Sequence, residues 1–357
     1  MLKKPRLILI VFLVTLLFST ALIAESNDLG LNQIIELALE ENLDLEMANL
    51  NLEDARIDHS KNQLNNLISN SRLFELQSEL QLLQAEENYN SVRNSVILNI
   101  IDSYIKIVKS DQEILSAEKE LALEARKIEE VKAQVEVGYK GTLELFEQET
   151  KHLAASNSLE RIKYQREQQL RELKQKIGKE NIAIEFIDLV IPQIWEVTED
   201  EVLAVAIENN TSIEIRDKQL NLAKSDLERA KVSGTAELEL KQKKIAFDRA
   251  ELNLIQEKQG FENSLKNIHF QYNQAVNNLE MTKKFLSQSR NNFDIIKEQF
   301  EAGLVSRNDM LSSELQVYYS ENNLISSIIS YYTSVLQLQE AMGLELEVNI
   351  EDGEKVK

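Results

Sequence analysis

The sequence contains no cysteine and little glycine or proline. Average usage would place about 25 glycines and about 18 prolines in a chain of 357 residues, whereas this chain has 9 and 2. The lack of cysteine excludes disulfides, thiolate metal sites and a lipid anchor on cysteine. The scarcity of glycine and proline argues against sheets joined by tight turns. Residues 31 to 137 contain neither breaker and are rich in helix formers, so this stretch predicts long helices.

Basic charge is also scarce, because the net charge is -20 at pH 7. The segment 1–24 holds Lys3, Lys4 and Arg6 without an acid, so the remainder of the chain carries -20 minus 3, which is -23. Such acidity argues against nucleic acid as a partner. We interpret it as the solvated surface of a helical protein, with an acidic docking surface as the alternative.

The one long apolar run, LILIVFLVTLLFSTALIA, follows the basic start MLKKPR. This order is typical of a secretory signal peptide over residues 1–24, with Ser19, Ala21 or Ala24 marking cleavage. An uncleaved anchor is the alternative, because the run from Leu7 to Ala24 is close to the lower length limit for a membrane-spanning helix. No later segment approaches that length without charges. We therefore expect an exported protein.

The chain repeats itself. IIELALEENLDLEMANLNLEDA, from Ile34, and VLAVAIENNTSIEIRDKQLNLA, from Val202, align without gaps at an offset of 168. A second pair of segments, which starts at Leu121 and Leu286, aligns at an offset of 165. We interpret the two offsets as a tandem duplication in which the second copy has lost about three residues between the aligned blocks.

Apolar residues within each copy follow the alternating three-and-four spacing of coiled coils. The seam is interrupted by Asp111, Glu118 and Lys132 in the first copy, and by Thr282 and Ser289 in the second. Helices with such seams must bury them against partner helices, because a single rod has no core of its own. The seam residues are Ile100, Tyr104, Ile107, Ile114, Leu121, Ala125, Ile128 and Val135, then Ile268, Tyr272, Ala275, Leu279, Leu286, Phe293, Ile296 and Phe300.

These patterns predict an all-α fold of duplicated long antiparallel coiled-coil hairpins, with at most a short strand pair. We place the first repeat at residues 25–190 and the second at residues 191–357. The first long helix should run from about Arg72 to Val137, and a helix of that length reaches about 99 Å. The segments after residues 178 and 343 are similar in character, so they are the candidates for the strand pair.

Glycine marks the ends of the long helices. Gly138 and Gly141 separate the first long helix from its returning partner, and Gly303 does the same in the second copy. Either Asn308 or Asp309 is then expected to cap the second returning helix.

The order of these features resembles the TolC-like outer-membrane efflux protein family. The resemblance is carried by the opening LNQIIELALEENLDLEMANLNLEDA with its echo in the second copy, and by the turn sequences VGYKGTLELFEQE and AGLVSRNDMLSSELQ. Each motif alone is weak, but their order, duplication and spacing cover most of the chain. The resemblance implies a homotrimer whose helices form a hollow barrel, which projects from the outer membrane toward the inner one and carries substrates along its interior.

The resemblance also implies a partner. In that family the helical tips meet a periplasmic adaptor, which belongs to an efflux pump or a type I secretion system with an inner-membrane pump. A glycine permits close backbone approach, and small apolar residues can seat in a partner's groove, which fits docking. The alternative is that Gly138 and Gly303 only form turns. The positions that match the family's tips are Gly138, Tyr139, Thr142 and Leu145, then Gly303, Leu304, Val305, Ser306, Asp309 and Leu311.

The sequence departs from that family in one interval. In the family, each copy of the repeat carries two membrane-spanning β-strands between its second helix and its long helix. Two such strands with a turn need about 25 residues of alternating character. Between Ala55 and Ala85 the alternation fails and helix formers dominate, and KVSGTAELELKQKK in the second copy offers at most one short alternating run. We therefore predict that these strands are missing.

No residues converge on a catalytic site. His59, His152 and His269 lie in unrelated helical contexts without metal-ligand spacing, and there is no glycine-rich phosphate loop. We expect no enzyme activity, no metal and no cofactor. Two functions stay open: a passive conduit at the outer membrane or in the periplasm, and a cell-envelope coiled-coil scaffold without a channel. A closed trimer would distinguish the conduit from a monomeric or dimeric scaffold.

Overall fold

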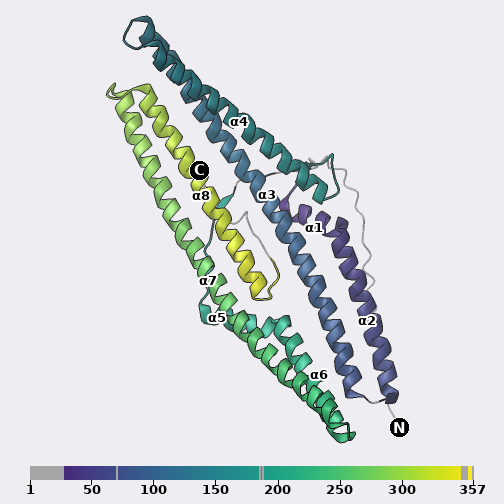
Figure 1. Cartoon of the computed structure of the whole chain (residues 1–357). Coiled ribbons are helices and arrows are strands. Elements are labelled where there is room, and N and C mark those ends of the chain that lie inside the picture. Colours follow the sequence, from purple (N-terminus) through teal and green to yellow (C-terminus); the bar gives the residue numbers. More distant parts are fainter. Residues whose placement is uncertain (1–27, 70, 185, 187–188, 347–352, 356–357) are drawn as a thin grey trace, which may run out of the picture.

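The structure is a computed structural model, and it shows a bundle of long helices (Figure 1). The signal peptide predicted for residues 1–24 lies outside the part of the chain that the structure describes. The described residues are 28–69, 71–184, 186, 189–346 and 353–355.

Four helices form the first copy. α1 (Leu31–Glu41) and α2 (Leu43–Ser69) lead into α3 (Arg72–Glu136), and α4 (Thr142–Lys176) returns alongside α3. α3 has 65 residues and ends one residue before the predicted end of the long helix. The uninterrupted run of helix formers therefore predicted this element correctly.

The second copy repeats this order. Its helices are α5 (Glu199–Asn209), α6 (Thr211–Val232), α7 (Glu237–Glu301) and α8 (Arg307–Ala341). The first residues of α5 and α6 lie at an offset of 168 from those of α1 and α2, whereas α7 and α8 begin at an offset of 165 from α3 and α4. The change of offset thus falls at the α6–α7 turn, and α6 is accordingly shorter than α2, with 22 residues instead of 27.

Short strands connect the ends of the helices. β1 (Asp28–Leu29) pairs in parallel with β2 (Ala183–Ile184), and β3 (Val190–Pro192) pairs antiparallel with β4 (Gly353–Lys355). The described residues thus contain two strand pairs, whereas the sequence predicted at most one. The segment after Gly178 pairs with the residues before α1, and the linker between the copies pairs with the tail. Each extended segment satisfies its backbone groups against the nearest one available.

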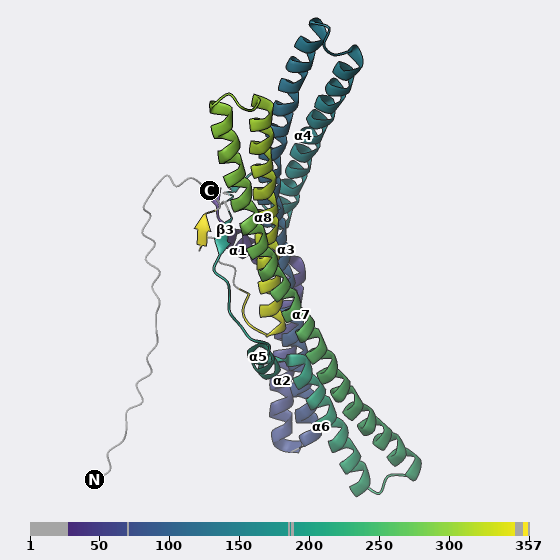
Figure 2. The same cartoon turned by 90° about the vertical axis from the view of Figure 1, so that its left-hand side faces the viewer.

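Two sets of contacts arrange the long helices side by side. α3 and α7 run through the whole molecule (Figures 1 and 2). In one half the order across the molecule is α7, α8, α3, α4, and in the other half it is α2, α3, α6, α7. The molecule is therefore four helices wide in each half. α7 forms one lateral edge throughout, whereas α4 and α2 form the opposite edge in turn.

The core lies at the middle of the molecule, where the short elements pack against the long helices. Tyr104 and Ile107 of α3 and Leu324 and Ile328 of α8 are fully buried there. Every residue of the two predicted seams is buried or half-buried. The heptad pattern therefore identified packing positions, as expected for coiled coils.

Helices occupy the interval in which the sequence predicted no spanning strands. α2 continues to Ser69 and α3 begins at Arg72, while α6 ends at Val232 and α7 begins at Glu237. The described residues of both intervals are therefore helical up to these ends and contain no strand. The prediction of helix in place of strand is confirmed there.

Candidate docking tips and lateral edges

The two tips, residues 137–141 and 302–306, share one backbone arrangement. Gly138 and Gly303 have φ of 75° and 73°, a region that side chains with a Cβ rarely adopt. Directly after each glycine, a backbone N–H reaches back into the helix: Tyr139 N donates to Gln134 O, and Leu304 N donates to Gln299 O, both at 2.8 Å. This closes the last turn of each long helix as a Schellman motif.

The returning helices begin differently. Ser306 is the N-cap of α8, because its hydroxyl oxygen accepts from Asp309 N at 3.2 Å, while Asp309 accepts from Ser306 N at 3.0 Å. The side-chain and backbone hydrogen bonds from Ser306 lower the pKa of Asp309. The expectation that Asn308 or Asp309 is the cap was therefore wrong: Asp309 is the third residue of a capping box. At α4 the N-cap is Gly141, whose N–H donates to Glu144 at 3.0 Å.

The tips lie at the same end of the molecule (Figures 1 and 2). Asn308 of α8 donates to Glu130 of α3 near this end. Tyr139 and Leu304 are strongly exposed, at 80% and 76% of their surface. Of the other predicted docking residues, Gly138, Thr142, Gly303, Ser306 and Asp309 are exposed, whereas Leu145, Val305 and Leu311 are half-buried.

The structure adds three residues to the first tip that the sequence did not single out. Val137, Leu143 and Phe146 are 80%, 70% and 70% exposed. They lie inside the quoted turn sequence, but an apolar residue beside a helix end is as often buried as exposed. Their exposure makes the first tip more apolar than the second.

Exposed apolar side chains also follow the outer face of α4. Leu143, Phe146, Leu153 and Tyr164 are all exposed and follow a three-and-four spacing, interrupted by polar residues. Residues at this spacing form one stripe along a helix. α2 carries a similar stripe of Leu43, Met47, Leu50, Ile57 and Leu64.

The opposite edge carries its own apolar surface on α7. Among the described residues, the inner helices α3, α6 and α8 expose only Phe74, Leu115, Val232 and Tyr319 among their large apolar side chains. The exposed apolar surface is therefore concentrated on the two lateral edges, where each stripe lacks a partner helix within the chain. On α7 the exposed residues are Leu238, Ile245, Leu252, Ile255, Phe270, Met281, Phe285 and Ile295.

Polar contacts join the two hairpins between the core and the tips. Lys119 of α3 pairs with Glu314 of α8 at 3.0 Å and lies 5.1 Å from the centre of the Tyr318 ring. The Tyr319 hydroxyl donates to Glu120 at 3.1 Å, and burial, with a further contribution from Glu120, raises the pKa of Tyr319 to about 12. These contacts hold α3 against α8 and so fix the two tips relative to each other.

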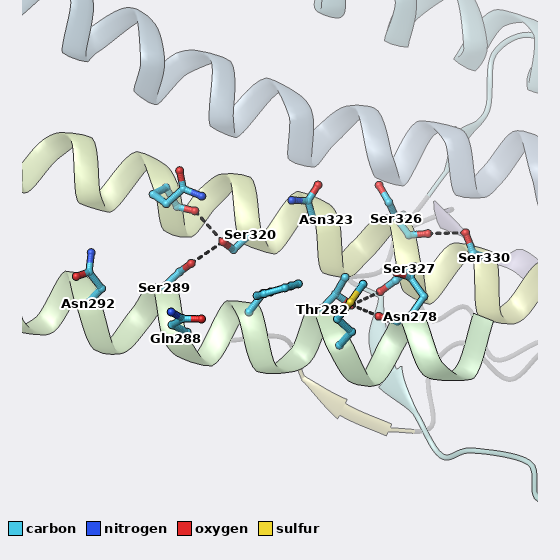
Figure 3. Close-up of a pocket in the computed structure, with 13 residues that line it drawn as sticks. Asn278, Thr282, Gln288, Ser289, Asn292, Ser320, Asn323, Ser326, Ser327 and Ser330 are labelled. Carbon is cyan, nitrogen blue, oxygen red and sulfur yellow. Dashed lines mark hydrogen bonds between the residues drawn. The ribbon is translucent and has the colours of Figure 1, made fainter. Parts of the chain in front are cut away.

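A polar groove of about 670 Å³ follows the seam between α7 and α8 (Figure 3). Ser289 and Ser320 share a hydrogen bond of 2.7 Å within it, and Thr282 and Ser327 share one of 2.6 Å. Most of the lining side chains carry hydroxyl or amide groups, but the exposed Met281 and Phe285 of α7 also line the groove. The groove is therefore of mixed character and adjoins the apolar surface of α7.

His59 and His269 take part in structural contacts, whereas His152 is half-buried on α4. His59 bonds Ser78 at 2.9 Å, and His269 bonds the backbone oxygen of Val197 at 3.2 Å. Among the described residues no group of histidine and carboxylate side chains is arranged to hold a metal ion. Nor does any helix in the described ranges combine the length and the apolar character needed to span a membrane.

By sequence, the chain matches no protein-family model and no curated protein. By structure, it has the fold of several outer-membrane channels. OprN is 13% identical, with a TM-score of 0.66 over 88% of this chain and 90% of that one. VceC of Vibrio cholerae is 13% identical, with a TM-score of 0.64 over 89% and 97%. MtrE of Neisseria gonorrhoeae is 15% identical, with a TM-score of 0.56 over 90% of each chain. The TolC-like fold predicted from the sequence is thereby confirmed.

Proposed function

We propose that the chain is the channel-forming subunit of a TolC-like conduit in the cell envelope, at the outer membrane or in the periplasm. The observation that carries this proposal is the apolar surface on both lateral edges, which fits side-by-side association of identical chains into a closed ring. The shared fold with outer-membrane channels supports a hollow assembly, and the resemblance found in the sequence implies three chains.

Matching heights on the two edges support such a ring. Lys163 of α4 pairs with Glu118 of α3 at 3.0 Å. Two residues further along α3, Glu120 accepts a hydrogen bond from the Tyr319 hydroxyl of α8. The next residue of α8 bonds Ser289 of α7. Tyr164 on one edge is therefore level with Ser289 on the other.

An exposed aromatic residue lies near that level on each edge. Phe285 of α7 is one helical turn from Ser289, and Tyr164 and Phe285 expose 60% and 54% of their surface. In a ring, the α4 edge of one protomer meets the α7 edge of the next at the same height. Tyr164 of one chain would then pack near Phe285 of its neighbour, and both would lose contact with water.

The tips supply the docking surface of this proposal. They lie at one end, project two glycine turns, and expose Tyr139 and Leu304. A periplasmic adaptor with a helical hairpin would seat its own tip between them, and through that adaptor an inner-membrane pump of an efflux or type I secretion system would supply the energy. The alternative, that the glycines only form turns, leaves the exposed apolar residues beside them without a role.

Transport by such a subunit is passive. The chain needs no catalytic residue or cofactor for it, because a hydrated passage lets the cargo diffuse once the pump has delivered it. The acidic surface does not favour nucleic acid as a partner.

Oligomeric state tests the proposal. Size-exclusion chromatography with light scattering on the purified chain should give the mass of a trimer, and negative-stain imaging should show rods with a hollow axis. A monomeric or dimeric rod without an interior would contradict the conduit and favour the coiled-coil scaffold.

A further inference from the structure

The end of the molecule opposite the tips also exposes apolar side chains. The α2–α3 and α6–α7 turns both lie there, and the α6–α7 turn extends furthest (Figures 1 and 2). Val232, the last residue of α6, is 90% exposed, and Leu238 in the first turn of α7 is 77% exposed. On the neighbouring α2–α3 turn, Leu67 and Phe74 are 83% and 58% exposed.

Charge distinguishes this end from the tips. The segment 222–247, centred on the α6–α7 turn, holds six basic and four acidic side chains, a net charge of +2. Segments of the same length give -1 around the α2–α3 turn (58–83), -2 around the first tip (127–152) and -3 around the second tip (292–317). The α6–α7 turn is thus the basic one of the four turns in a strongly acidic chain.

Three of its basic side chains point to a ligand outside the chain. Arg229, Lys231 and Lys244 are exposed and take part in none of the ion pairs found among the described residues, whereas Lys241 and Lys243 are paired within the turn. The sixth, Lys224, is exposed and outside those ion pairs as well, but it lies furthest along the chain from the turn. Together with Val232 and Leu238, they define what we call the distal surface.

We propose that the distal surface binds an anionic phospholipid membrane surface, with Val232 and Leu238 inserted between headgroups and the three basic side chains on the headgroup phosphates. Apolar side chains flanked by basic ones are the pattern of segments that lie in a membrane interface. Leu67 and Phe74 of the neighbouring turn would contact the same surface. The proposal does not depend on the conduit, because a monomer presents the same turn.

A second copy of the chain is a poorer occupant of this surface. Two distal surfaces would bring like charges together, and the strongly exposed Val232 would face another basic turn. An anionic headgroup layer instead satisfies the basic side chains and accepts the apolar ones, and each Lys or Arg strengthens such binding by about fivefold.

Site-directed fluorescence can test the proposal on the full chain. Because the sequence has no cysteine, an introduced cysteine is the single thiol that a probe can label. A Val232→Cys variant carries a polarity-sensitive probe at the distal surface, and a Leu304→Cys variant carries it at the second tip. On addition of vesicles that contain phosphatidylglycerol, the probe at position 232 should shift to blue emission, while the probe at position 304 stays aqueous. The apolar N-terminal run is the same in both variants, so the difference between them reports the distal surface alone.

Charge variants complete the test. The triple variant with Arg229→Gln, Lys231→Gln and Lys244→Gln should shift the equilibrium from the inserted turn toward the free turn by roughly a hundredfold. Higher salt should also favour the free turn. The matched control replaces Lys132, Lys140 and Arg307 near the tips with Gln and should leave the emission unchanged. Circular dichroism checks that the variants keep their helix content.

Three results would overturn the proposal. These are an unchanged emission at position 232, an equal response with pure phosphatidylcholine vesicles, and a blue shift that grows with protein concentration without lipid. The last would assign the surface to a second copy. The first two do not bear on the oligomeric mass, and the third reports association at the distal surface and not at the lateral edges, so failure here is separate from failure of the conduit.

Discussion

The two hairpins of the molecule have the same lengths and the same glycine turns, yet different chemistry fills their seams. Between α3 and α4, Asp111 pairs with Arg166 at 2.8 Å, and Glu118 pairs with Lys163. Between α7 and α8, small hydroxyl side chains meet instead, as in the bond between Thr282 and Ser327. At the interruptions of the seam, charged contacts thus join the helices of the first copy and small hydroxyl contacts join those of the second, where the ion pair of Arg290 with Glu321 at 2.8 Å lies beside them.

This difference explains the interruptions in the heptad pattern. Asp111, Glu118, Thr282 and Ser289 each break the apolar seam, and each finds a polar partner on the returning helix. A polar contact at a seam position fixes the register of two helices at some cost in stability. Lys132, the remaining interruption, is exposed.

The largest effect we expect comes from breaking the feature that both hairpins share, the glycine turn. Replacing Gly303 with Arg and Leu304 with Glu should abolish export by a reconstituted pump, because bulk and charge would keep the adaptor from the tip. The same change at Gly138 and Tyr139 should act equally. Transport assays with purified or expressed partners measure the loss.

The control for these variants lies at the other end of the molecule. Gly234 has φ of 68° and open space around it, so Gly234→Arg carries the same backbone cost of about 1 kcal/mol without touching a tip. It should leave export and helix content unchanged. Equal loss of export from all three variants would show that the turns matter only for folding.

A smaller effect is expected on stability, where truncation of a core residue should cost more free energy of unfolding in the second hairpin than in the first. Leu279 of α7 is fully buried, whereas Ile114, its counterpart in the first copy, is half-buried. Leu279→Ala should lower the free energy of unfolding by about 2 to 5 kcal/mol, and Ile114→Ala by about 1 kcal/mol. Urea unfolding followed by circular dichroism measures both. Equal losses would mean that the two hairpins pack equally tightly.

The smallest effect concerns pH. Burial would raise the pKa of Glu124, but hydrogen bonds from Lys127 and Gln148 outweigh it and lower the pKa below its usual 4.5. The ionised form is therefore favoured in the folded state, so Glu124 stabilises the first hairpin above pH 4.5, and this contribution is lost as the pH falls through its lowered pKa.

Substitution isolates that contribution. Glu124→Gln should remove about 1 kcal/mol or less at neutral pH and flatten the decline of stability below pH 4.5. The matching site of the second hairpin, Ser289, has no titrating group, and Ser289→Ala should leave the acid dependence as it is. An unchanged acid profile in Glu124→Gln would contradict the assignment.

The sequence predicted what depends on local pattern. The helical character of α3 follows from the breaker-free run and its C-terminal end from Gly138, and the copies follow from two constant offsets. The second strand pair was missed because strands of two or three residues carry no periodicity of their own. The cap at Ser306 was missed because Asp309, three residues later, is an equally good cap by residue type.

The lateral edges were missed for a different reason. Leu153 and Tyr164 have the same spacing as seam residues, and a heptad pattern does not state whether the partner helix lies in the same chain or in another. Only the arrangement of α7, α8, α3 and α4 shows that these stripes face outward.

Cross-linking between edges tests the central claim most directly, since the chain has no cysteine of its own. A variant with Tyr164→Cys and Phe285→Cys, treated with a short thiol cross-linker, should give covalent products that stop at three chains. Tyr164→Cys with Leu252→Cys uses the same edges at mismatched heights, about 50 Å apart, and should give none. An open-ended ladder, equal products from both pairs, or only monomer would contradict a closed ring of three.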